Sequence, residues 1–147
     1  MTNALIAFAR AVGWGTLAGA TPYMALLIIP MSLATLMAGY GSIGEIASLL
    51  AYPLMLSGSM VLGAALLCGL PLTALLSVMD RENSLAYAVT GLALGALVPP
   101  AIIWLLAGEV MFGESLFFAA PGAFAGLVTG TSWGRWREAP REAQDAL

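Results

Sequence analysis

Charged residues are scarce in this sequence of 147 residues, where they make up only 9%. Soluble domains carry roughly 25% charged residues. Here 61% of the residues are hydrophobic, and the mean hydropathy is +0.94. The composition therefore indicates an integral membrane protein that crosses the bilayer several times.

Several residue types on which catalysis and metal binding depend are missing. Histidine and lysine are absent, and the single cysteine, Cys68, lies in an apolar run. These absences exclude Ser–His–Asp and Cys–His triads, Schiff-base lysines, histidine-rich metal sites and intramolecular disulfides. With a formal net charge of −3, the chain also lacks the basic surface that nucleic acids require. We expect no catalytic residue, no metal or cofactor site, and no nucleic-acid partner.

Four apolar runs, at about 11–38, 46–79, 85–107 and 115–133, are long enough to cross a membrane. A transmembrane helix needs about 20 such residues. The loops between the runs are short, which favours antiparallel packing of successive helices. The sequence therefore predicts an all-α integral membrane protein. Its expected fold is a four-transmembrane-helix bundle over residues 1–134, followed by a polar tail at 135–147.

The first two runs are longer than a span requires. We expect their four prolines to kink them or to begin short turns; these are Pro22, Pro30, Pro53 and Pro71. The third run contains the pair Pro99-Pro100, which removes two backbone donors. A fixed helix break is one interpretation, and carbonyl groups freed to line a permeation path are the other.

All five arginines flank alternate ends of the apolar runs: Arg10, Arg81, Arg135, Arg137 and Arg141. Because positive charge gathers in cytoplasmic loops, both termini are expected in the cytoplasm. We expect no cleavable signal peptide, since Arg10 follows the short apolar start rather than preceding it. The lysine-free composition, rich in Ala, Gly, Leu and Arg, suggests a GC-rich bacterial or phage source, and the expected location is the bacterial inner membrane.

Part of the chain resembles itself. Residues 30–51 align without a gap with residues 99–120, and the identical pairs include Pro30 with Pro99, Gly39 with Gly108 and Glu45 with Glu114. This pattern predicts two tandem helical hairpins, at about 11–79 and 85–134, in parallel repeat. The alternative is the ordinary likeness of membrane hairpins built from Ala, Gly, Leu and Pro.

The repeated glutamate has two possible roles. Ser42 and Glu45 have the spacing of a capping box, and Glu114 occupies the matching place without a serine three residues earlier. Capping the following helix is one role for both carboxylates. The other is a pair of acids at the outer mouth of a pore.

Glycines spaced four residues apart form a stripe along the fourth run, and shorter stripes occur on the first and third runs. Such a glycine zipper lets two helix backbones approach closely in lipid. The helix-packing residues are Gly15, Gly19, Gly91, Gly95, Gly122, Gly126, Gly130 and Gly134. The stripe could pack inside this bundle, or against another copy or a partner protein.

Two enzyme-like motifs and a charged turn have simpler explanations. The GxGxxG of residues 39–44 joins two spans rather than a strand and a helix. The GxSxG of residues 130–134 has no histidine or lysine to activate its serine. The charged residues Asp80, Arg81 and Glu82 are interpreted as a solvated turn.

Two functional classes follow from these observations. One is a non-catalytic subunit or assembly factor of a larger membrane complex, consistent with the packing stripes and the small extramembrane mass. The other is a homo-oligomeric pore or small transporter, holin-like or passing a neutral solute, consistent with the repeat and the proline-broken spans. The uncharged spans argue against ion coupling. The expected partners are the lipid bilayer and other membrane subunits or copies of this chain.

Overall fold

A computed structural model describes the chain apart from residues 1, 40–41, 80–81, 109–111 and 146–147. It also leaves the side chains of residues 2, 106–107, 112, 114 and 140–145 undescribed. The described elements are all helical: α1 (Thr2–Tyr23), η1 (Met24–Ile28), α2 (Ile29–Met37), α3 (Ile43–Ala64), η2 (Ala65–Gly69), α4 (Leu70–Val78), α5 (Ser84–Ala107) and α6 (Phe112–Asp145).

Four helical stretches in the described chain are long and apolar enough to cross a membrane. They are Asn3–Met37, Ile43–Val78, Ser84–Leu105 and Ser115–Ala139. The prediction of an all-α membrane fold with four spanning helices is therefore confirmed. The long apolar surface agrees with this: many large hydrophobic side chains, such as Leu26 and Leu67, are exposed and are suited to contact with lipid.

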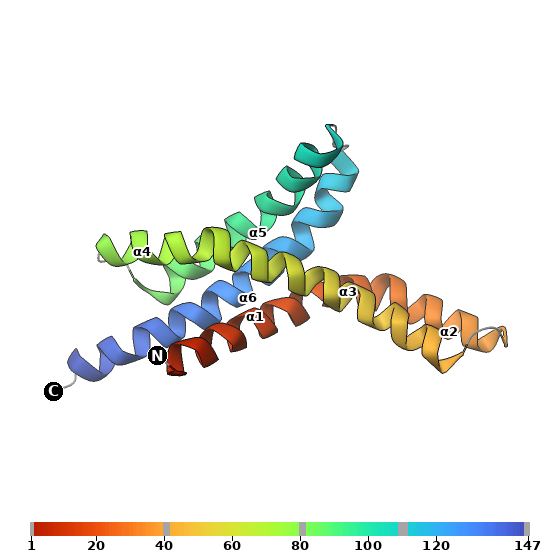
Figure 1. Cartoon of the computed structure of the whole chain (residues 1–147), viewed down its shortest axis with the longest axis horizontal. Helices are drawn as coiled ribbons and strands as arrows, with labels where there is room; N and C mark the ends of the chain where they lie inside the picture. Colours follow the sequence, from red (N-terminus) through yellow and green to blue (C-terminus); the bar gives the residue numbers. More distant parts are fainter. Residues whose placement is uncertain (1, 40–41, 80–81, 109–111, 146–147) are drawn as a thin grey trace.

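The four spans do not lie parallel along their whole length. Figure 1 shows the start of α1, the end of α4, the start of α5 and the end of α6 gathered at one end of the molecule. The tip between α2 and α3 points to the opposite side, and the tip between α5 and α6 forms a separate arm. The bundle is therefore closed at one end and open between its two hairpins at the other.

Each of the first two spans contains one π turn just before a proline. The amide of Ile29 donates to the carbonyl of Met24, and that of Leu70 donates to Ala65. Pro30 and Pro71 follow directly. A proline ring collides with the carbonyl four residues earlier and leaves it without a donor. A π turn widens the helix there, so the spans continue through these two prolines instead of ending.

Glycine pairs bring α5 and α6 into backbone contact in antiparallel register. A Cβ added to Gly91 would overlap the carbonyl oxygen of Gly126, and one added to Gly126 would lie 2.7 Å from the carbonyl carbon of Gly91. Gly95 and Gly122 have the same reciprocal relation. Any side chain at these four positions would force the helices apart, which explains the residue type that the sequence uses there.

The same α5–α6 register continues toward the start of α5. An added Cβ at Gly130 would overlap the carbonyl oxygen of Tyr87, and one at Gly134 would lie 2.7 Å from the Cα of Ser84. All four glycines of the fourth span therefore pack on α5 within this chain. Their glycine face is occupied and is not free for another copy or a partner.

Helix α1 packs between α6 and α3 through its own small residues. A Cβ added to Gly15 would overlap the side chain of Thr129 in α6. A Cβ added to Gly19 would lie 2.6 Å from the Ser57 hydroxyl of α3. The Ser57 hydroxyl donates to the Thr16 carbonyl at 3.0 Å. Ala11, a buried residue, lies on the same side of α1. The first hairpin is thus attached to the second mainly through α1.

The two turns at the hairpin tips share their local geometry. Gly39 and Gly108, aligned by the internal repeat, have φ values of +73° and +74°. Only glycine adopts this left-handed conformation readily, so each ends its helix. The capping box predicted at Ser42 and Glu45 is confirmed, with the Ser42 amide donating to the Glu45 carboxylate at 2.7 Å.

The hairpins differ in their interiors despite this shared turn. Pro30 is exposed and follows a π turn, whereas its aligned partner Pro99 is buried inside the uninterrupted α5. A polar tail separate from the fourth span was expected at 135–147. In the structure, α6 instead continues as one helix from that span to Asp145.

Candidate functional site

An apolar cleft of about 130 Å³ lies where all four spans come together. Its walls are α3, η2 and α4 on one side and α5 on the other, with α6 and the start of α1 between them. Its apolar lining includes Ala64, Leu72, Leu94, Gly95, Val98 and Ala125. This volume is close to that of one aromatic ring or one large aliphatic side chain in a dry protein cavity.

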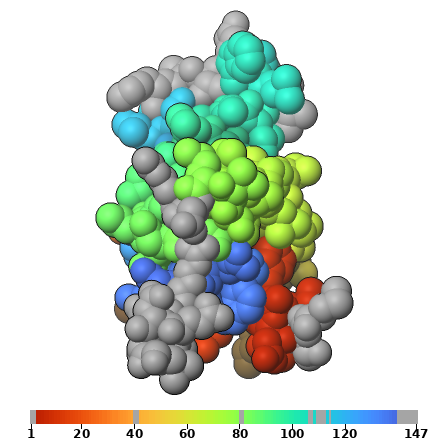
Figure 2. Space-filling view, turned by 90° about the vertical axis from the view of Figure 1, so that its left-hand side faces the viewer, coloured from red at the N-terminus to blue at the C-terminus, as the bar shows by residue number. Residues whose placement is uncertain are grey.

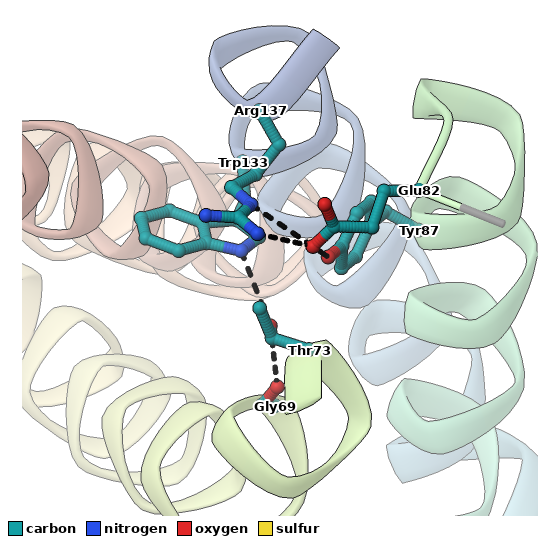
Figure 3. Close-up of polar contacts among 6 residues, drawn as sticks. All are labelled: Gly69, Thr73, Glu82, Tyr87, Trp133 and Arg137. Carbon is teal, nitrogen blue, oxygen red and sulfur yellow. Dashed lines mark hydrogen bonds and ion pairs between the residues drawn. The ribbon is translucent and has the colours of Figure 1, made fainter. Parts of the chain in front are cut away.

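Four of the lining residues carry hydrogen-bonding side chains, and they lie toward the closed end of the bundle: Thr73, Tyr87, Thr129 and Trp133. The Trp133 indole donates to the Thr73 hydroxyl at 3.2 Å, and this hydroxyl donates to the Gly69 carbonyl at 2.9 Å (Figure 3). The chain of bonds connects α6 to α4 and η2. It is a polar link between the two hairpins at the level of the cleft.

A second polar group lies beside this link and includes Tyr87, which lines the cleft (Figure 3). Glu82, which is only 6% exposed, accepts a hydrogen bond from the Tyr87 hydroxyl at 3.1 Å. Its same oxygen accepts from Nε of Arg137 at 3.1 Å and forms an ion pair with that guanidinium (Figure 3). A buried carboxylate is costly unless it is paired and hydrogen-bonded. Arg137 and Tyr87 supply both requirements.

The interpretation of residues 80–82 as a solvated turn is wrong for Glu82, because this side chain is buried and paired. Asp80 and Arg81 lie outside the described residues. One signal in the sequence could have indicated the pairing. Arg137 lies seven residues after Gly130 and three residues after Gly134. These spacings place it on the same face of α6 as the glycines, at the end that packs against the start of α5.

The Pro99-Pro100 pair lies within α5, and Pro99 lines the cleft. Pro99 leaves the Gly95 carbonyl without its intrahelical donor. That carbonyl faces Gly122, where an added Cβ would overlap it and would also lie 2.9 Å from Cγ of Pro99. Because Gly122 has no side chain, the Pro99 ring and the Gly95 carbonyl can both lie against α6. A Cα–H group of α6 can there serve as a weak donor to that carbonyl.

The other candidate residues lie away from the cleft centre or outside the description. Glu45 is exposed and holds the cap of α3, and the Glu114 side chain is not among those described. Cys68 is half-buried in η2 as a free thiol. Residues 130–134, which match GxSxG, lie within the helix α6, whereas a nucleophilic serine of that motif needs a strand-to-helix turn.

The chemistry that this cleft offers is binding by shape and apolar surface. Three of its polar side chains, Thr73, Tyr87 and Trp133, bond to groups of the chain itself, and Thr129 donates to the Ala125 carbonyl at 2.8 Å. Within the described part of the chain, no group of three or more His, Cys, Asp or Glu residues could hold a metal ion.

No protein-family model, curated protein or solved structure matches this chain.

Proposed function

We propose that this protein is a non-catalytic subunit or assembly factor of a larger membrane complex. The observation that carries the proposal is the cleft between the two hairpins. It is apolar, and its hydrogen-bonding side chains are already bonded within the chain. A site of this kind supports recognition of an apolar surface rather than bond chemistry or passage of a polar solute.

The partner that fits best is a transmembrane helix carrying one large apolar side chain. The cleft volume of about 130 Å³ holds one such side chain and is too small for a whole helix. In lipid, helix association depends on close van der Waals packing, because lipid tails are as apolar as the helices themselves. A side chain inserted between the hairpins supplies that packing.

The test is native mass spectrometry of the tagged protein, extracted gently from its own membrane. Ala64 lines the cleft, whereas Ala74 is exposed on the neighbouring α4. We expect a stoichiometric membrane partner with the unmodified chain and with Ala74→Phe. Ala64→Phe fills the cleft and should lose that partner while the protein stays monodisperse. Retention of the partner by Ala64→Phe would contradict the role of the cleft.

A homo-oligomeric pore or small transporter is the second candidate. The π turns before Pro30 and Pro71 favour it, since such turns are frequent at functional sites of helices. A defined homo-oligomer with no other subunit in the same mass spectrum would favour this candidate. Flux of a neutral solute into liposomes that contain only this protein would then establish it.

A further inference from the structure

A second groove lies on the other side of the α1–α6 pair, away from the apolar cleft. It is formed by one face of α1 and one face of α6 and has a volume of about 760 Å³. Its lining combines cationic, aromatic and aliphatic side chains, among them Arg10, Trp14, Leu127, Val128, Arg135 and Trp136. We call it the arginine groove. Figure 2 shows the two helices that form it, red and blue, side by side below α4.

The two arginines of this groove lie at nearly the same height along it. Gly15 faces Thr129 and Gly19 faces Ala125, so α1 and α6 run in opposite directions. Five residues before Gly15, the same register brings Arg10 level with residue 134, next to Arg135. Both side chains are exposed. In the described part of the chain, neither forms an ion pair, in contrast to Arg137.

We propose that the arginine groove binds the phosphate group of an anionic phospholipid. Two guanidinium groups facing one groove provide forked donors that match phosphate oxygens. Their two charges favour a headgroup with net negative charge over a zwitterionic one. Basic pockets between transmembrane helices at a membrane surface bind such headgroups for the same reason.

The remaining lining residues favour a lipid over free phosphate. Trp14 and Trp136 have the amphipathic rings that prefer the interface between headgroups and acyl chains. Leu127 and Val128 extend the groove from Arg135 toward the interior of the span. They offer an acyl chain an apolar path directly below the charged groups, which a free phosphate ion would not use.

The experiment compares lipids retained by the full-length chain in nanodiscs of phosphatidylcholine and phosphatidylglycerol. Native mass spectrometry after release measures the ratio of the two lipids bound. We expect enrichment of phosphatidylglycerol, and about a fivefold loss of that enrichment in Arg10→Gln or Arg135→Gln. This factor corresponds to about 1 kcal/mol for each arginine near a membrane surface.

The matched control is Asn83→Asp, which lowers the net charge by one unit at the same end of the molecule. Asn83 caps α5 by accepting from the Ala86 amide at 2.7 Å, and aspartate caps equally well. We expect Asn83→Asp to keep the enrichment. An equal loss in this control would mean that net charge alone attracts the lipid, and it would overturn the proposal, as would unchanged enrichment in both arginine variants.

A competition with millimolar inorganic phosphate distinguishes the two sources of the phosphate group. Enrichment of phosphatidylglycerol that persists in phosphate supports a lipid site. Displacement of the lipid by phosphate would overturn the lipid as the occupant and assign the groove to a free phosphate-bearing solute.

Discussion

Glu82, at the turn before α5, and Arg137, near the end of α6, form a partly buried ion pair at the closed end of the bundle. The carboxylate is almost fully buried, whereas the side chain of Arg137 is 31% exposed. The pair ties the connection between the two hairpins to the last turns of the fourth span. Through the Tyr87 hydroxyl it is also bonded to a residue that lines the apolar cleft.

Removing Arg137 should destabilise the fold. Arg137→Gln leaves the buried Glu82 carboxylate without its counter-charge, at an expected cost of about 3 kcal/mol, the lower end of the range for broken buried pairs. We expect a cost at the lower end of this range because Arg137 is partly exposed, and solvent therefore weakens its attraction to Glu82. Unfolding in mixed micelles measures the loss. The double variant Glu82→Gln/Arg137→Gln should be more stable than Arg137→Gln alone, and simple additivity would show that the pair does not couple.

The bond between Trp133 and Thr73 should couple the two hairpins. Trp133→Phe removes the indole donor of one hydrogen bond, which should cost about 1 kcal/mol in this environment. Thr73→Val removes the acceptor of that bond and also the hydroxyl's own bond to the Gly69 carbonyl, so it should cost more. Because Trp133→Phe removes a bond that Thr73→Val has already broken, the double variant should be little less stable than Thr73→Val alone. A double-mutant cycle of unfolding free energies checks this. The sum of two independent losses would contradict coupling through this bond.

Gly126→Ala should loosen the contact between α5 and α6, because the added Cβ would overlap the Gly91 backbone, which cannot rotate away. We expect a loss of about 1–3 kcal/mol, the range for overpacked interiors. The matched control is Gly13→Ala in α1, where nothing lies within 4 Å of the added Cβ. That change should stabilise the helix by about 0.5–1 kcal/mol. Thermal unfolding of both variants in one detergent makes the comparison, and equal effects would contradict the close contact.

Glu45→Gln separates the two roles proposed for this residue. Glutamine can still accept from the Ser42 amide in a capping box, so the stability should change by less than about 0.5 kcal/mol. Ser42→Ala, which removes the other half of the box, should cost about 1 kcal/mol. If Glu45 acts at the mouth of a pore, liposome cation flux should fall in Glu45→Gln and not in Ser42→Ala. Equal flux in both variants leaves capping as its role.

Features that depend on neighbouring residues were predictable from the sequence. The four spans follow from hydropathy over about 20 residues, and the cap of α3 follows from the spacing of Ser42 and Glu45. The glycines of the fourth span indicated that another helix packs closely on this face. A stripe without side chains makes few van der Waals contacts with lipid but lets another helix backbone approach closely. The choice of α5 as that neighbour did not follow, because several helix faces carry small residues.

Hydropathy and residue spacing were enough to recognise a membrane protein with four spanning helices, because both act within one span or one turn. Which helix faces meet could be seen only in the folded chain. It buried Glu82 against Arg137 and left Arg10 and Arg135 together on one groove. The environment of a charge at a helix end could not be predicted, because it depends on residues tens of positions away that the register between helices brings into contact.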